Sequence, residues 1–109
     1  MGASRRSCSD TYRGPKPFSE KNTKAMSDYI LRLRRSTDLQ LYMTMHSYGQ
    51  YFMYPWGHAK ADVADWKHLH ALAQAANEGF KSKGGYSYEI GSAAKMLYEA
   101  SGECKLGFL

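Results

Sequence analysis

Residues 39–50 read Leu39-Gln40-Leu41-Tyr42-Met43-Thr44-Met45-His46-Ser47-Tyr48-Gly49-Gln50. Every odd position from 39 to 45 is apolar, and this period of two predicts a β-strand with at least one buried face. His46 then lies at the carboxyl end of the predicted strand. In an open sheet with crossover helices, ligands bind beyond the carboxyl ends of the strands, so His46 is better placed to hold a metal than a histidine in mid-helix. A catalytic zinc needs about three protein ligands plus a water, and no recognisable ligand pattern accompanies this histidine.

Two helices are predicted on either side of this stretch. The first begins at Ser19, a suitable N-cap residue, and ends in the basic run 32–35, which suits the negative end of a helix dipole. The second runs from about Asp62 to Lys83 and is stopped by two glycines. The apolar residues recur at helical spacing, as Ala25, Met26, Tyr29, Ile30 and Leu33 in the first helix and Trp66, Leu69, Ala73, Ala76 and Phe80 in the second.

Two further strands are predicted, over Tyr51–Tyr54 and Tyr86–Ile90. Residues 1–18 contain two prolines and form an irregular lead-in, and residues 91–102 are small and turn-rich. The order helix, strand, strand, helix, strand indicates an α/β fold in which helices are layered on a sheet. Three strands and two helices leave sheet edges unpaired, so the sheet is incomplete and can self-associate through those edges.

The bulk composition excludes several classes of protein. The chain has 109 residues, of which 43% are hydrophobic and 14% aromatic, so it is built to pack and is not disordered. It contains no run of 18 apolar residues, which argues against a membrane partner. The net charge of +5 comes from scattered lysines and arginines, which we interpret as solvated helix faces and not as a nucleic-acid surface. Cys8 and Cys104 could form a disulfide or remain free thiols.

Five blocks of residues in this order resemble the zinc metallocarboxypeptidases of the carboxypeptidase A/B family. The resemblance covers residues 2–102 and implies a partial catalytic domain over residues 1–102, part of a mixed-sheet, helix-layered zinc carboxypeptidase domain, with a divergent tail over residues 103–109. It also implies that Cys8 is unpaired, its family partner lying upstream. The blocks are Cys8-Ser9-Asp10-Thr11-Tyr12-Arg13-Gly14, Phe18-Ser19-Glu20, His46-Ser47-Tyr48-Gly49-Gln50, Tyr54-Pro55-Trp56-Gly57 and Leu97-Tyr98-Glu99-Ala100-Ser101-Gly102.

The resemblance implies roles for individual residues. His46 corresponds to the third zinc ligand of the family, and Ser47 and Tyr48 would line the substrate groove beside it. Tyr98 resembles the mobile tyrosine that covers the substrate and hydrogen-bonds its C-terminal carboxylate, because a phenol donates at neutral pH. The pocket for the terminal side chain would be lined by Met53, Ala93 and Ala100.

The chain lacks the other parts of the family's zinc site. The first two ligands of the family come from a His-x-x-Glu motif, and the residues three positions after the four histidines are glycine or alanine. The glutamate that activates water in the family is missing as well, so no catalytic residue is present and one of three expected zinc ligands is found. We expect zinc as the cofactor, peptide or protein C-termini as partners, and an extracellular location by family, with no signal peptide in this chain.

Three functional hypotheses follow from these observations. The family activity is a zinc-dependent exopeptidase that releases C-terminal amino acids from peptides, and we expect the isolated chain to be inactive. The first alternative is a non-catalytic truncated product or peptide-binding pseudoenzyme that uses its exposed sheet edges. The second alternative is a small basic binding module for acidic partners, whose affinity would fall steeply with salt.

Overall fold

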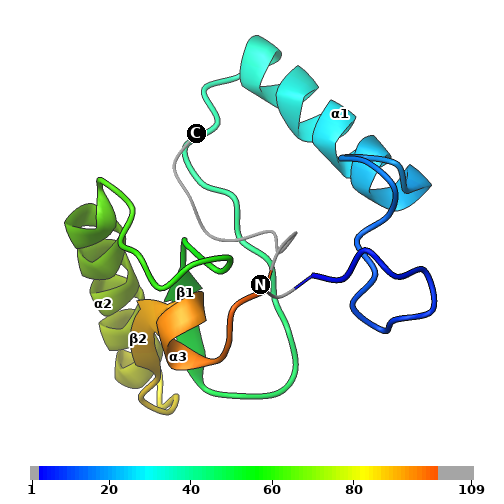
Figure 1. Ribbon diagram of the computed structural model, residues 1–109. Helices are drawn as coiled ribbons and strands as arrows, with labels where there is room; N and C mark the ends of the chain where they lie inside the picture. The colour runs from blue at the N-terminus through cyan, green and yellow to red at the C-terminus, as the bar shows by residue number, and fades with distance from the viewer. Residues whose placement is uncertain (1–2, 101–109) are drawn as a thin grey trace.

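The computed structural model describes residues 3–100 of the chain. Helix α1 spans Lys21–Ser36, strand β1 spans Tyr51–Tyr54, helix α2 spans Trp66–Ser82, strand β2 spans Glu89–Ser92 and the short helix α3 spans Ala93–Met96. Figure 1 shows α1 set apart from a group formed by α2, α3 and the two strands. The alternation of helices and strands confirms the α/β class predicted from the sequence.

The two strands form a parallel pair in which Tyr51 lies opposite Glu89 and Tyr54 lies opposite Ser92. A parallel pair needs a crossover connection, and α2 supplies it (Figure 1). The pairing extends by one hydrogen bond before the strands, since the Glu89 N–H donates to the Gln50 carbonyl at 2.8 Å. The register therefore places residues 50–54 and 89–92 side by side.

The two faces of this strand pair are covered by different helices. Side chains alternate along a strand, so Phe52 and Tyr54 share one face and Met53 points to the other. Helix α2 packs on the first face, where the Phe52 and Phe80 rings are 5.7 Å apart. Helix α3 turns back over the second face, because a Cβ atom at position 91 would lie 2.8 Å from the sulfur of Met96. A side chain at position 91 would therefore require the Met96 side chain to move.

Helix α2 contributes two of the five buried apolar residues in the described part of the chain. Leu69 and Ala73 are buried on its apolar face, as predicted, together with Ala93 and Ala94 at the start of α3. The helix also ends where the sequence predicts, with the N–H of Gly84 donating to the Lys81 carbonyl and that of Gly85 to the Phe80 carbonyl. These two hydrogen bonds pair carbonyl groups of the last helical turn, as at other helix ends capped by glycine.

The start of α2 differs from the prediction. The helix begins at Trp66 and not near Asp62. The carboxylate of Asp62 lies 2.6 Å from the Lys95 ammonium of α3 instead, and the Trp66 N–H closes a turn onto the carbonyl of residue 63. The loop before α2 is therefore held against α3.

Asn77 joins α2 to the segment that enters β2. Its amide nitrogen donates to the Tyr88 carbonyl at 3.1 Å, and its amide oxygen accepts from the Tyr88 N–H at 2.8 Å. The side chain is 7% exposed. One buried amide thus satisfies both backbone groups of Tyr88, which would otherwise be unpaired.

Several predicted boundaries are wrong. Residues 39–45 are not a strand: Tyr42 alone among them makes a β-bridge, and the two strands described within residues 3–100 pair with each other. The last predicted strand, Tyr86–Ile90, corresponds to β2, which spans Glu89–Ser92 instead. The hydrogen bonds of Asn77 hold Tyr88 just before β2 begins to pair with β1. The turn-rich region after it contains α3. Helix α1 has Glu20 as its N-cap, and the Ser19 hydroxyl donates to the Glu20 carboxylate.

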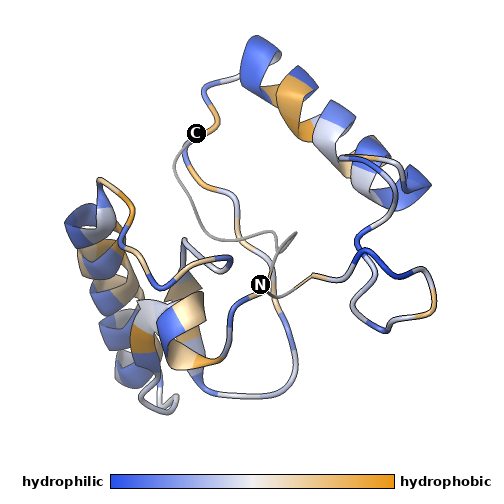
Figure 2. Ribbon diagram, in the orientation of Figure 1, coloured by the Kyte–Doolittle hydropathy of each residue, from blue (hydrophilic) through white to orange (hydrophobic). Residues whose placement is uncertain are grey.

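Helix α1 is amphipathic, as predicted, but none of its residues is buried. Its apolar band lies between polar turns in Figure 2. Across residues 3–100, no helix is long and apolar enough to cross a membrane.

The hydrogen bonds of Asn77 predict that removing its side chain lowers the stability of the chain. We expect Asn77→Ala to lower the free energy of unfolding by about 1–3 kcal/mol, because the N–H and carbonyl of Tyr88 lose their partners in a buried place. Urea unfolding followed by tryptophan fluorescence measures the change. Gln74→Ala, on the exposed side of the same helix, is the matched control, and equal effects of the two substitutions would contradict this role.

The raised pKa of Tyr54 predicts that the stability of the chain depends on pH at alkaline pH. Its hydroxyl lies 3.1 Å from Nδ1 of His70, and burial, followed by the nearby Asp62 carboxylate, raises its pKa above the ordinary 10.0, with Lys95 opposing. The folded chain then holds the phenol proton at a pH where the unfolded chain has lost it. The contribution of the protonated Tyr54 phenol to the free energy of unfolding is complete below about pH 9 and is lost as the pH rises through 10 and above.

We therefore expect the unfolding free energy of Tyr54→Phe to fall less steeply with pH above about pH 10 than that of the parent chain. Urea unfolding at a series of alkaline pH values measures both slopes. The exposed Tyr86 gives the control Tyr86→Phe, and a Tyr54→Phe profile parallel to the parent profile would show that Tyr54 does not contribute.

Candidate functional site

His46 lies in the extended segment that leads into β1 and is exposed. Its Nε2 is 3.4 Å from the Thr44 hydroxyl, at the long end of the hydrogen-bond range. Within residues 3–100, no group of three or more His, Cys, Asp or Glu side chains is placed to hold a metal ion. The imidazole can thus offer one ligand, and the described part of the chain does not complete a metal site around it.

The other histidines lie elsewhere. The His58 ring lies beside the Trp56 ring at an interplanar angle of 60°, with the ring centroids 5.0 Å apart. His70 is engaged by Tyr54 through Nδ1 and lies edge-on to Trp66. The contacts of these two histidines are with Trp56, Tyr54 and Trp66 and not with His46.

Ser47 and Tyr48 follow His46 and are both exposed, with Tyr48 fully so. The peptide bond between them is cis. Gly49 has φ +132°, and a Cβ atom there would lie 2.9 Å from the Tyr51 ring. Only glycine fits this turn, which redirects the chain from His46 into β1.

Three of the predicted pocket residues lie along the strand pair and the segment after it. Met53 is opposite Gly91 in the register. Ala93 begins α3 and is 2% exposed, so its side chain is not accessible in this structure. The Ala100 N–H donates to the Gly57 carbonyl at 2.6 Å. The N–H of Ala94 donates to the Trp56 carbonyl in the same way, so residues 93–100 run beside residues 56–57.

Tyr98 lies between these tethered alanines. Its side chain is 68% exposed, and the backbone on either side is held by the Leu97 N–H on the Ala93 carbonyl and by the Ala100 hydrogen bond. A phenol that is exposed on an anchored backbone is free to meet a ligand. This geometry is compatible with the role that the resemblance implies.

The predicted site residues form two groups and not one. His46, Ser47 and Tyr48 precede the amino end of β1, whereas Ala93, Tyr98 and Ala100 follow the carboxyl end of β2. In the part of the chain that the structure describes, no hydrogen bond or ring contact joins the two groups. Met53, in the middle of β1, lies between them along the strand.

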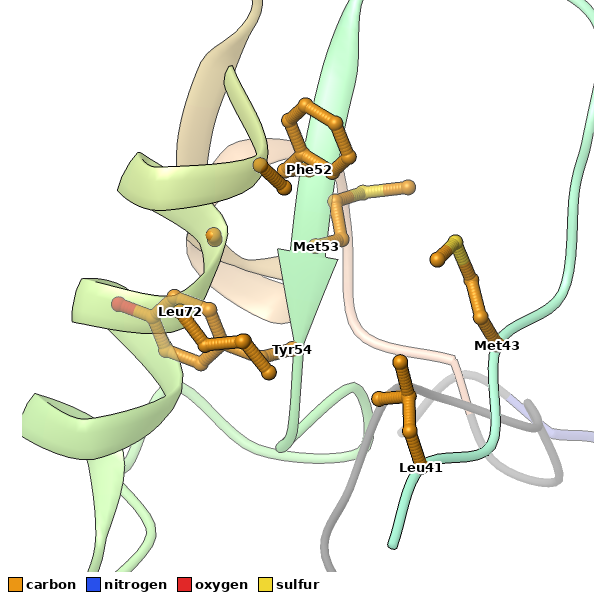
Figure 3. A pocket seen from close by; sticks show the side chains of 8 residues that line it. Leu41, Met43, Phe52, Met53, Tyr54 and Leu72 are labelled. Carbon is orange, nitrogen blue, oxygen red and sulfur yellow. The ribbon is translucent and has the colours of Figure 1, made fainter. Parts of the chain in front are cut away.

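A hollow beside β1 is lined by aliphatic side chains and two aromatic ones (Figure 3). Its volume is about 30 Å³. Of the predicted pocket residues it includes Met53 alone. The lining residues are Leu41, Met43, Phe52, Met53, Tyr54, Leu72, Ala73 and Ala76.

Sequence reasoning missed a polar cluster under α3. Tyr54 and His70 are hydrogen-bonded there, and the Asp62–Lys95 ion pair lies close enough to shift the pKa of the phenol. The hydroxyl of Ser92, opposite Tyr54, is buried and has no hydrogen-bond partner among residues 3–100. A signal was present, because His70 follows Trp66 by four residues and so shares its helix face.

The comparisons with known proteins place this arrangement in context. The family model described as zinc carboxypeptidase matches residues 1–105. Carboxypeptidase B of Astacus astacus is 41% identical over 102 residues, which cover 94% of this chain and 33% of that protein. Carboxypeptidase A2 of Rattus norvegicus is 38% identical over 101 residues, which cover 93% of this chain and 24% of that protein.

A solved structure agrees with the sequence relatives. Bovine thrombin-activatable fibrinolysis inhibitor, in complex with tick carboxypeptidase inhibitor, matches with a TM-score of 0.81 and 32% sequence identity. The match covers 93% of this chain and 34% of that one. The chain thus spans about a third or less of the length of these relatives. Because the family model and relatives above 30% identity cover nearly all of its residues, the chain belongs to the zinc carboxypeptidase family.

Proposed function

We propose that this chain is part of a zinc-dependent exopeptidase that releases C-terminal amino acids from peptides, and that its 109 residues alone are inactive. The observation that carries the proposal is the family match over residues 1–105. The relatives named above are carboxypeptidases, and the chain spans a minority of their length. The activity is therefore assigned to a larger domain to which these residues contribute.

His46 is proposed as the contribution of this chain to the zinc site. Its imidazole is exposed and only weakly engaged by Thr44, so a nitrogen is available to a metal. A catalytic zinc takes about three protein ligands. Residues 3–100 supply one candidate and do not by themselves fit the ion, which is why we infer that the isolated chain is inactive.

The substrate-binding roles are proposed residue by residue. Tyr98 would donate its phenol proton to the terminal carboxylate of a peptide, and its exposure on an anchored backbone supports this. Ser47 and Tyr48 would line the groove, and both are exposed. Met53, Ala93 and Ala100 would surround the terminal side chain, although Ala93 would first have to become accessible.

The remaining features of the proposal follow from the family. Peptide or protein C-termini are the proposed partners, and the extracellular space is the proposed location. The bovine relative is in complex with a tick carboxypeptidase inhibitor, so a protein inhibitor is a further proposed partner of the assembled domain. Residues 1–102 are proposed as the partial catalytic domain; the tail over residues 103–109 lies outside the described residues.

Non-catalytic peptide binding is the second candidate function. The observation that favours it is the exposure of large apolar side chains along the extended segment before β1. In this case the isolated chain would bind peptides without cleaving them. Titration of the isolated chain with an unlabelled peptide, followed by tryptophan fluorescence, distinguishes this candidate from an inert fragment.

One test of the proposed function uses the isolated chain. We expect no release of C-terminal residues from a peptide substrate in the presence of zinc, and no zinc retained after dialysis, because one histidine is a weak site. Mass spectrometry of the peptide and metal analysis of the protein measure the two. Retained zinc at one ion per chain, together with cleavage, would contradict the proposal.

Another test of the proposed function examines His46 in a complete domain. We expect a chimera, in which this chain replaces the matched 102 residues of Astacus astacus carboxypeptidase B, to lose at least about 100-fold in kcat/KM on His46→Gln, since the variant lacks a metal ligand. Metal analysis should show the loss of zinc as well. The exposed His58 provides the control, and an equal loss in His58→Gln would exclude a specific role for His46.

A further inference from the structure

Three arginines lie close together near the end of α1. Residues 32–35 read Arg32-Leu33-Arg34-Arg35, and the short polar residues Ser36-Thr37-Asp38 follow them. The negative end of the helix dipole accounts for positive charge in the last turn, but lysine would serve that purpose equally. The dipole therefore explains the charge of this run and leaves the spacing of its arginines unexplained.

The three arginine side chains are exposed. Within residues 3–100, the ion pairs are formed by lysines and not by these arginines. Arg32 lies over the ring of Tyr29, with its guanidinium carbon 5.4 Å from the ring centroid. The guanidinium groups are thus open to the carboxylates of another protein, with which arginine forms paired hydrogen bonds.

The three guanidinium groups do not share a face of the helix. Successive residues of an α-helix are about 100° apart, so Arg34 lies about 200° around the axis from Arg32. One surface of a partner cannot contact all three while the helix is folded. In an extended chain side chains alternate, so Arg32 and Arg34 project to one side and Arg35 to the other. The spacing therefore suits a partner that binds this stretch as an extended strand.

The last turn of α1 can open without disturbing a core, because no residue of α1 is buried. The Thr37 N–H donates to the Leu33 carbonyl at 2.8 Å, and the Ser36 hydroxyl donates to the Arg32 carbonyl at 3.1 Å. Exposed hydrogen bonds at the end of a helix open at little cost in free energy. Directly beyond the helix, Thr37 is already extended, with φ −142° and ψ 160°.

Helix α1 is also set apart from α2 and the strand pair (Figure 1). The hydrogen bonds described for residues 3–36 have all of their partners within residues 3–37. Exposed polar segments of this kind are the preferred places at which proteases cut folded chains. When opening and closing are fast, the rate of cutting follows the population of the open form.

We propose that the Arg35–Ser36 peptide bond is a processing site for an endoprotease that recognises arginine at the first, second and fourth positions before the bond it cuts. Such an enzyme would offer carboxylates to the guanidinium groups, which remain charged at any physiological pH. Hydrolysis consumes one water molecule and leaves a carboxylate on Arg35 and an α-amino group on Ser36. The cut separates α1 from the segment that carries His46. This inference does not depend on the proposed function.

The full 109-residue chain provides the test. It is incubated with a purified subtilisin-like endoprotease that requires arginine at the first and fourth positions before the cut, and mass spectrometry follows the products with time. We expect residues 1–35 and 36–109 as the first products. The rate should be no less than about a tenth of that for a synthetic peptide of residues 29–41, since an opening that costs about 1.4 kcal/mol leaves this fraction open.

Arg32→Lys tests the fourth position and keeps the charge of the helix end. We expect it to slow the cut at least about tenfold, because an ammonium cannot replace the bidentate hydrogen bonds of a guanidinium. Arg5→Lys makes the same change at an exposed arginine outside the run and should leave the rate unaltered.

Trypsin at limiting concentration, which needs one basic residue only, compares the end of α1 with α2. We expect cuts within residues 32–36 to precede cuts at Lys67 and Lys81, because α2 has a buried face.

Three results would overturn the proposal. The first is a chain that resists the paired-basic endoprotease while the peptide of residues 29–41 is cut, since the last turn of α1 would then stay closed. The second is an Arg32→Lys chain that is cut as fast as the parent chain, which would show that the fourth position is not recognised. The third is trypsin cleavage within α2 that is as fast as cleavage near Arg35.

Discussion

The parallel pairing of β1 and β2 is the constraint on which the rest of this structure depends. A parallel pair cannot be closed by a tight turn, so the chain must return through α2, and the amide of Asn77 then holds that helix to the entry of β2. Beyond the strands, the hydrogen bonds from Ala94 and Ala100 to residues 56 and 57 continue the same alignment. Burial in the described chain is concentrated around this unit.

This constraint explains why the candidate site is divided. The strand pair fixes residues 93–100 on one side and leaves the segment that carries His46 to enter from the other. Tyr98 is thus held on an anchored backbone, while His46 follows a segment with exposed apolar side chains. Under the proposed function, the two groups would both contribute to one site of a larger catalytic domain.

Both long helices, β1 and the glycine stop of α2 could be predicted from local sequence, because helix periodicity and capping act within a few residues. The sequence predicts a strand over residues 39–45 that the structure does not have. Alternation indicates which side chains favour burial, but it does not indicate whether a neighbouring strand is present to bury them. The displacement of β2 depends on Asn77, eleven residues before Tyr88. His46 and Tyr98 are proposed as site residues from the resemblance to family motifs, whereas their separation across the strand pair is a property of the fold.

Native-state hydrogen exchange of the isolated chain, resolved by residue, tests most directly the claim that the strand pair and α2 form the stable unit. The amides of Tyr88 and Glu89, which donate to Asn77 and Gln50, should exchange most slowly, together with those in the middle of α2. The amides of α1 should exchange fast, because a 16-residue helix without a buried face is marginal in water. Protection of α1 equal to that of the strand pair would contradict this account.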